Sequence, residues 1–352
     1  MSQSNRVEFA HNLRGLAALL VVVAHLGLLY WYWHSAVILY TGITPYAGTP
    51  PLISRLLNHV QLFNFGELGV SIFFLISGFV IPFALEKQTR LQFLIGRVFR
   101  IWPTYVAGLT VTLLSLAVAS WYFAIPFVPT LHSIVASLLL SPSLLAQPSI
   151  DGIVWTLEIE IKFYALLVLF PALTRNNTLL LLAAIGLLLA SFALKNHPVA
   201  ANDYTYLIYM FVGVLFNQHY HNRINGGQFV GLSVMFLTLF FISTGWISSY
   251  VTGLAVFAVC YLFQQRLAFL SLFNRLANIS YPLYCCHTIL GYVVLSIFLS
   301  HYHRPTIALL LAVVLALVLA TVIHKLIEVP TSEYGRQLGA RLAARQFRCR
   351  SR

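Results

Sequence analysis

The first apolar segment of the chain, residues 13–33, contains two side chains that could do chemistry inside a membrane, Arg14 and His25. In a regular α-helix their spacing places them within roughly 20° of one face and roughly 16 Å apart along the axis. An elongated ligand on that face could place an anionic end at Arg14 and a reactive group at His25. Arg14 alone could be a topological anchor, whereas a histidine at this depth is costly and usually faces a cavity or a partner. We therefore treat both as candidate site residues.

A second group of polar side chains lies in the apolar segment 153–173, which contains Glu158, Glu160 and Lys162. Charges at the centre of a membrane helix cost about 2.5–3.5 kcal/mol each on insertion scales. Glu158 and Lys162 have the i, i+4 spacing that predicts an ion pair. Glu160 points elsewhere and lacks a local cation. We predict that it has an interior role, either orienting a histidine or receiving a proton.

Two further clusters complete the candidate set. The segment 277–299 contains Tyr281, Tyr284 and His287. Arg97 and Arg100 are three residues apart and share one helical face. Two guanidinium groups in this arrangement suit a phosphate, although each alone could also serve as a topological charge.

The elements that must position these residues are membrane helices. The chain has 352 residues, of which 59% are hydrophobic and only 9% are charged, whereas a soluble domain averages about 25% charged residues. This composition predicts an all-α, polytopic transmembrane helix bundle of about ten spans. The predicted spans are 13–33, 66–85, 101–121, 153–173, 178–195, 204–219, 228–245, 249–264, 277–299 and 305–327.

The distribution of Lys and Arg predicts the orientation. With the N-terminus inside and alternating spans, sixteen basic residues fall on the inner side and three on the outer side. This bias follows the positive-inside rule and predicts that both termini are cytoplasmic. Residues 1–330 would form the transmembrane domain, and residues 331–352 a basic cytoplasmic tail that touches anionic membrane lipid. Because the net charge of +12 lies in loops and in this tail, we do not expect a nucleic-acid partner.

The chain has four cysteines, three in apolar segments and one in the basic tail, so we expect no disulfide framework. The first apolar run is too long for a signal-peptide core, and we interpret it as an uncleaved first span.

Six sequence motifs, in order, resemble the acyltransferase-3 family of integral-membrane acyltransferases over about residues 9–335. The first is an Arg-x10-His pattern formed by Arg14 and His25. The others are GVSIFFLISGFVIP, RVFRIWPTY, WTLEIEIKFY, SYPLYCCH and IEVP. The adjacent Cys285–Cys286 pair departs from the family pattern, in which larger apolar residues are common at that place.

The resemblance implies an O-acyltransferase that uses cytoplasmic acyl-CoA, with acetyl-CoA as the first candidate donor. The acceptor would be a hydroxyl of a cell-surface or lipid-linked carbohydrate such as O-antigen, reached from outside the bacterial inner membrane. We expect neither a permanently bound cofactor nor a metal site.

The resemblance also assigns roles to residues. His25 would be catalytic, with Glu160 as its candidate partner, and Arg14, Arg97 and Arg100 would hold the donor. The remaining substrate-binding candidates that occupy motif positions are Trp155, Tyr164, Tyr281, His287 and Glu328.

Two questions stay open from sequence. His25 could act as a general base or could carry the acyl group itself, and either Glu160 or His287 could assist it. The alternative function is a polytopic secondary transporter of a small solute or glycan, which would favour broken helices in corresponding halves of the chain. No such symmetry is evident.

Overall fold

A computed structural model of the chain describes residues 5–60, 64–194, 200–244, 247–263 and 273–350, and all regular elements in these ranges are helices. Each of the ten predicted spans coincides with one helical segment. The first is α1 (Asn5–Val22), which continues through a π-helix, η1 (Val23–Leu29), into α2 (Tyr30–Tyr32). The others are α5 (Phe65–Lys87), α6 (Arg90–Phe123), α8 (Val154–Leu169), α9 (Asn177–Ala193), α10 (Ala200–Tyr220), α11 (Gly226–Ser243), α12 (Ile247–Leu262), α13 (Asn274–Tyr302) and α14 (Pro305–Ile323).

Six helices in the described part of the chain are long and apolar enough to cross a membrane. They are Glu8–Tyr32, Phe65–Lys87, Arg90–Phe123, Gly226–Ser243, Asn274–Tyr302 and Pro305–Ala344. Two shorter apolar helices, α9 and α12, accompany them. This all-helical architecture is typical of an integral membrane protein, because a helix satisfies its own backbone polar groups in lipid.

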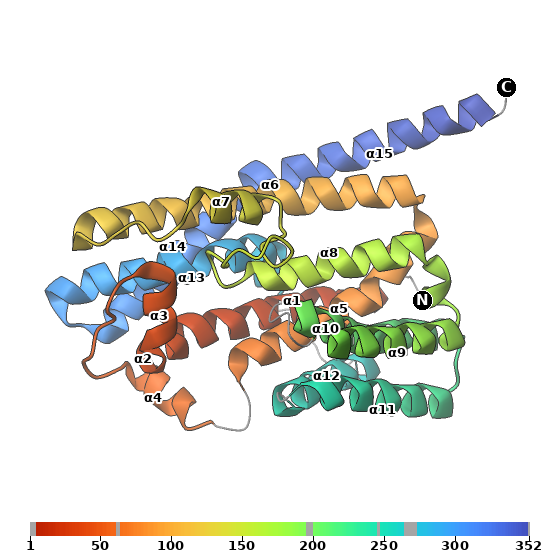
Figure 1. Ribbon diagram of the computed structural model, residues 1–352, viewed down its shortest axis with the longest axis horizontal. Helices are drawn as coiled ribbons and strands as arrows, with labels where there is room; N and C mark the ends of the chain where they lie inside the picture. The colour runs from red at the N-terminus through yellow and green to blue at the C-terminus, as the bar shows by residue number, and fades with distance from the viewer. Residues whose placement is uncertain (1–4, 61–63, 195–199, 245–246, 264–272, 351–352) are drawn as a thin grey trace.

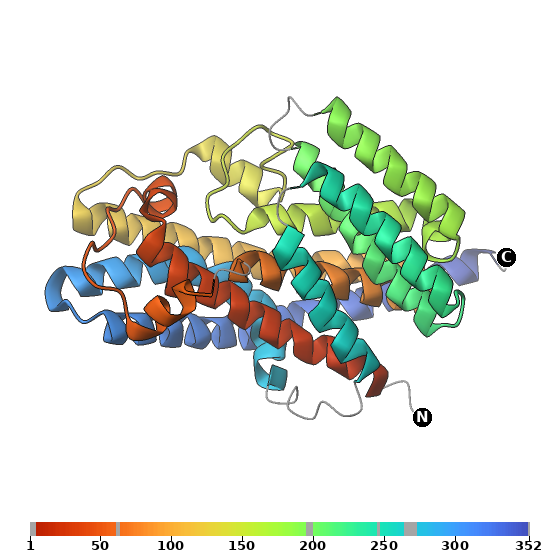
Figure 2. The same ribbon diagram turned by 90° about the horizontal axis from the view of Figure 1, so that it is seen from below.

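The long helices run along the long axis of the molecule, and the chain termini lie toward the same end of it (Figure 1). The opposite end carries the hairpin between α13 and α14 and the short helices α3 (His34–Thr41) and α4 (Leu52–Asn58). Figure 2 shows the same placement after a quarter turn. Another short helix, α7 (Leu131–Leu138), lies between α6 and α8 in the chain.

The centre of the bundle is built on α1, α5 and α13. α1 packs against both α5 and α13, α13 also packs against α6 and α14, and α5 packs against α10. The contact between α5 and α10 depends on Gly78 and Gly213. A Cβ added to Gly78 would lie 2.1 Å from the Met210 carbonyl oxygen. Small residues of this kind let helix backbones approach closely in membrane proteins.

The basic end of the chain forms a helix, α15 (Val329–Arg350), which follows α14 through a short π-helix, η4 (His324–Glu328). α15 packs along α6 (Figure 1). The ring of Tyr334 lies 5.3 Å from that of Phe99, and Gly335 allows close contact with Phe99. α15 thus packs against the helix that carries Arg97 and Arg100.

Among the described residues, the three cysteines of the apolar segments are free and buried.

Candidate active site

The structure brings together two histidines that are 262 residues apart. Nδ1 of His25 lies 2.9 Å from Nε2 of His287, and the ring centroids are 5.0 Å apart. His287 is fully buried in α13. His25 lies in the π-helix η1, so the angle predicted from a regular α-helix does not apply at this position. π-Helical turns are rare and often occur at functional sites.

The hydrogen bonds of His287 determine how the pair is protonated. Its Nδ1 lies 2.9 Å from the Leu283 carbonyl oxygen and 3.0 Å from that of Tyr284. A carbonyl oxygen can only accept, so Nδ1 of His287 carries the proton and Nε2 of the neutral ring is an acceptor. Nδ1 of His25 must then donate to His287. This leaves Nε2 of neutral His25 with a free lone pair, which is the form a general base requires.

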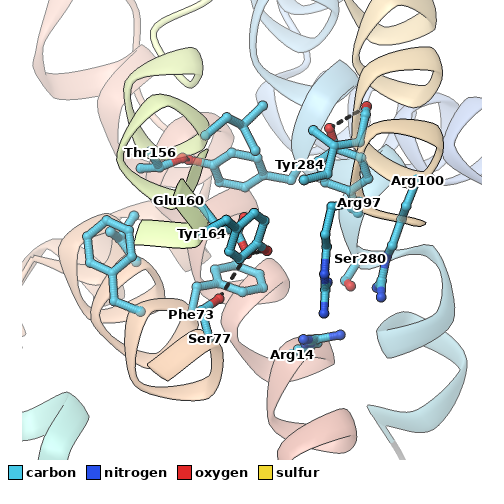
Figure 3. A pocket seen from close by; sticks show the side chains of 15 residues that line it. Arg14, Phe73, Ser77, Arg97, Arg100, Thr156, Glu160, Tyr164, Ser280 and Tyr284 are labelled. Carbon is cyan, nitrogen blue, oxygen red and sulfur yellow. Dashed lines mark hydrogen bonds between the residues drawn. The ribbon is translucent and has the colours of Figure 1, made fainter. Parts of the chain in front are cut away.

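All three candidate arginines line a narrow cavity of about 90 Å³ (Figure 3). Arg14 comes from α1, and Arg97 and Arg100 come from α6. Figure 3 shows the three side chains gathered at one end of the cavity. The Arg97 guanidinium also lies over the rings of Tyr164, at 5.1 Å, and Phe93, at 5.2 Å. Tyr281 lines the same cavity and donates its hydroxyl hydrogen to the Ile101 carbonyl oxygen, at 2.8 Å.

One acidic side chain, Glu160, lines the cavity together with these three arginines. Within the described ranges, none of them forms an ion pair with a carboxylate. Like charges held together in a partly buried cavity are unfavourable without a counter-charge. The cavity is therefore suited to an anionic ligand, and a phosphate can accept two hydrogen bonds from each guanidinium.

Glu160 lies in the arginine cavity and not beside the histidines. Its Oε1 accepts hydrogen bonds from the Tyr164 hydroxyl and from the Ser77 hydroxyl, the latter at 3.0 Å. The residue that contacts His25 is His287. Of the two candidates that the sequence left open as the neighbour of His25, the structure thus places His287 in contact.

The predicted ion pair of Glu158 and Lys162 is present, at 3.5 Å. Lys162 also contacts Asp203 of α10, at 2.5 Å. Sequence analysis missed Asp203, although an isolated acidic residue next to an apolar segment was a usable signal. Lys162 thus pairs with two carboxylates that are buried in the protein.

A second, wider cavity of about 590 Å³ contains His25 and Trp155. We call it the outer cavity, because residues of α4 also line it and α4 lies at the end of the molecule opposite to the termini. Arg14 and His25 therefore line two different cavities, whereas the sequence predicted one shared face. Val70 and Tyr284 line both cavities, so the two spaces meet at these side chains.

Tyr284 forms part of the boundary between the cavities. Its hydroxyl lies 2.7 Å from the Thr156 hydroxyl oxygen, and its ring centroid lies 6.2 Å from that of His287. The sequence indicated Tyr284 as a polar residue of its span but gave it no role, and it did not indicate Ser77 or Thr156, although all three lie within the motifs. The motifs did not indicate which of their polar side chains face a cavity.

Glu328 is separate from both cavities. It lies in η4 and pairs with Nδ1 of His324, at 2.7 Å, and neither cavity includes it among its lining residues. Among the described residues, no group of three or more His, Cys, Asp or Glu side chains is arranged to hold a metal ion.

Comparison with known proteins identifies the family. The acyltransferase-3 family model, described as an acyltransferase domain, matches residues 7–325. Comparisons with curated proteins and with solved structures found no match. The family match spans most of the chain and includes both cavities, and it does not favour the transporter alternative. The chain belongs to the acyltransferase-3 family and is a membrane acyltransferase.

Proposed function

We propose that the protein is an O-acyltransferase that moves an acyl group from cytoplasmic acyl-CoA to a hydroxyl of a cell-surface or lipid-linked glycan. Acetyl-CoA is the proposed donor, and O-antigen is the proposed acceptor. The proposed location of the protein is the bacterial inner membrane. One observation carries this proposal: an arginine-lined cavity and a His25-lined cavity meet at Val70 and Tyr284. A donor and an acceptor could therefore approach the reacting centre from opposite sides.

The donor is proposed to bind with its phosphates at Arg14, Arg97 and Arg100. Acyl-CoA carries several phosphate charges, and this cluster has no carboxylate partner in the described part of the chain. The pantetheine arm is long and thin, which suits a narrow cavity that is lined by Tyr284, whose ring centroid lies 6.2 Å from that of His287. Glu160 and Tyr164 would shape this cavity, since they hydrogen-bond to each other beside Arg97.

The proposed reaction uses His25 as a general base. Nε2 of His25 takes the proton of the acceptor hydroxyl, and the hydroxyl oxygen attacks the thioester carbonyl carbon. The carbon–sulfur bond then breaks, and the thiolate of CoA leaves with the proton returned from His25. His287 is a positioning residue in this scheme, because it accepts the Nδ1 hydrogen of His25 in both the neutral and the charged form.

The proposed topology has ten spans with both termini in the cytoplasm. It rests on the excess of Lys and Arg in alternate loops and on the location of the termini toward one end of the bundle (Figure 1). Residues 1–330 would then be the transmembrane acyltransferase domain. Residues 331–352 would be a basic cytoplasmic tail that contacts anionic lipid.

The decisive experiment is mass spectrometry of surface glycans from cells that produce the wild-type chain, an inactive His25→Ala chain or neither. The proposal expects acylated glycan only with the wild-type chain. Purified protein in lipid nanodiscs should transfer the labelled acetyl group of acetyl-CoA to the same glycan. If surface glycans are identical in all three cell types, the proposed acceptor is wrong. If purified protein does not bind acetyl-CoA, the proposed donor is wrong.

A further inference from the structure

Among its described lining residues, the outer cavity has one acidic side chain, and it has no Lys or Arg. Glu67, in the first turn of α5, lines this cavity. The described lining residues include no other Asp or Glu and no Lys or Arg. Glu67 forms no ion pair with any described basic side chain. The described lining of the outer cavity thus has one carboxylate and no Lys or Arg, whereas three arginines and one carboxylate line the arginine cavity.

Glu67 retains hydrogen-bonding capacity toward the cavity. Its Oε2 accepts a hydrogen bond from the hydroxyl of the fully buried Tyr250, at 2.8 Å. This bond restrains the carboxyl group and leaves Oε1 available to accept from a ligand hydroxyl. Hydrogen bonds to an acidic oxygen are among the stronger ones in proteins.

Besides Glu67 and His25, the described lining is mostly aliphatic, with four aromatic side chains and a few neutral polar ones. Trp155 lines the same cavity. Its ring centroid lies 6.3 Å from that of Phe74 and 5.4 Å from that of Tyr206. Asn58 and Asn64 supply amide groups. Aromatic side chains with a few fixed polar groups are typical of small-molecule sites. They suit a pyranose, which has apolar C–H faces and a rim of hydroxyls.

We propose that the outer cavity accepts a neutral sugar and excludes an acidic one, and that Glu67 determines this selectivity. A uronic acid would bring its carboxylate beside Glu67, in a cavity whose described lining has no Lys or Arg to pair with either group and whose His25 is neutral until it takes the acceptor proton. Burying an unpaired charge is costly, and such a repulsive element is a common source of specificity. This inference rests on the proposed function, because it assumes a carbohydrate acceptor.

The test uses the full-length protein in lipid nanodiscs with acetyl-CoA. The acceptors are four neutral methyl pyranosides (glucoside, galactoside, mannoside and rhamnoside) and the methyl uronides that correspond to the first three. Transfer is followed by mass spectrometry, and kcat and KM are measured for each acceptor. The variants are Glu67→Gln and, as a matched control, Tyr250→Phe, which removes the bond to Glu67 but keeps the carboxyl group. Binding of acetyl-CoA is measured separately by calorimetry.

For the wild type, we expect transfer to at least one of the glucoside, galactoside and mannoside, and at least tenfold lower kcat/KM for the corresponding uronide. Glu67→Gln should raise KM for the neutral sugar about tenfold, with a smaller change in kcat, and should reduce the discrimination against the uronide about tenfold. Tyr250→Phe should keep the discrimination.

Equal use of the neutral and acidic sugars by the wild type would overturn the inference. It would also be overturned if Tyr250→Phe lost discrimination as fully as Glu67→Gln, because Glu67 would then act only through packing. If acetyl-CoA binds and no pyranoside is acetylated, the carbohydrate acceptor of the proposed function fails, and this inference fails with it. If acetyl-CoA does not bind at all, the proposed donor site has failed independently.

Discussion

At the scale of single residues, the hydrogen bonds of His287 connect the backbone of α13 to the side chain of His25. The carbonyl oxygens of Leu283 and Tyr284 orient the His287 ring, and that ring orients His25. A catalytic histidine commonly depends on a second group that sets its tautomer. Here a second histidine occupies the place that a carboxylate takes in many enzymes.

We predict that His25→Ala lowers acyl transfer by at least about a hundredfold, which is the lower range for loss of a general base. The measurement is the rate of acetyl transfer to glycan in nanodiscs. Thermal unfolding of the variant should resemble that of the wild type. Product formation at the wild-type rate would exclude His25 as the base.

For His287, we predict that Gln preserves more activity than Phe. The Gln side-chain oxygen can accept the Nδ1 hydrogen of His25, whereas Phe would leave that hydrogen without a partner. The comparison is of kcat for the two variants, with donor binding as the control, since His287 lies outside the arginine cavity. Equal kcat for both variants would argue against a positioning role.

For the arginine cluster, we predict that Arg14→Lys, Arg97→Lys and Arg100→Lys each weaken acetyl-CoA binding. Lysine keeps the charge but cannot form the paired hydrogen bonds of a guanidinium. The expected loss is about tenfold for each, and it is measured by calorimetry. Arg175→Lys is the matched control, because Arg175 pairs with Glu86 outside both cavities. If all three variants bind as tightly as the wild type, the arginines serve only to orient the helices.

At the scale of elements, the site depends on backbone contacts between helices that are distant in sequence. α5 carries Val70 and Ser77 of the arginine cavity and Glu67 of the outer cavity. Its position is set by close packing against α10 at Gly78 and Gly213. Gly78 of α5 therefore supports the site although it lines neither cavity.

We predict that Gly78→Ala destabilises the protein by about 1–3 kcal/mol, the usual cost of overpacking a filled core. The new methyl group would collide with the Met210 carbonyl, which cannot move independently of α10. Gly231→Ala in α11 is the control, because no heavy atom lies within 4 Å of its added Cβ. There, alanine should be neutral or mildly stabilising. The readout is the thermal unfolding midpoint in detergent, and equal midpoints for both variants would contradict the predicted packing.

At the scale of the whole molecule, the two cavities have different sizes and opposite charge character. The arginine cavity is narrow and cationic, whereas the outer cavity is wider and contains Glu67. They meet in the middle of the bundle, between α1, α5, α8 and α13. In the proposed topology, this arrangement would admit the donor and the acceptor from opposite sides of the membrane.

We predict that positions 90 and 130 face opposite sides of the membrane. Position 90 begins α6, and position 130 precedes α7, after the C-terminal end of α6 in the chain. Single cysteines at these positions, in a cysteine-free background, should be labelled by an impermeant reagent from opposite sides of oriented vesicles. Labelling of both from the same side would overturn the proposed span count.

The sequence by itself determined which segments are helical. Each apolar run satisfies its backbone hydrogen bonds internally, so hydropathy and length predict it without knowledge of its neighbours. The Glu158–Lys162 pair was predictable for the same reason, because its partners are one helical turn apart. The family motifs also include most of the residues that line the arginine cavity, among them Arg14, Arg97, Arg100, Glu160 and Tyr164.

Only the tertiary structure decided which of these residues meet. The His25–His287 contact joins helices separated by 262 residues, and the spacing of residues within one helix cannot predict it. The π-helix that changes the direction of His25 depends on local packing and not on hydropathy. The division into two cavities, and the placement of Glu160 beside Arg97 instead of beside His25, result from side chains contributed by separate helices. Burial of a side chain depends on which helices pack around it, and that packing is a property of the whole bundle.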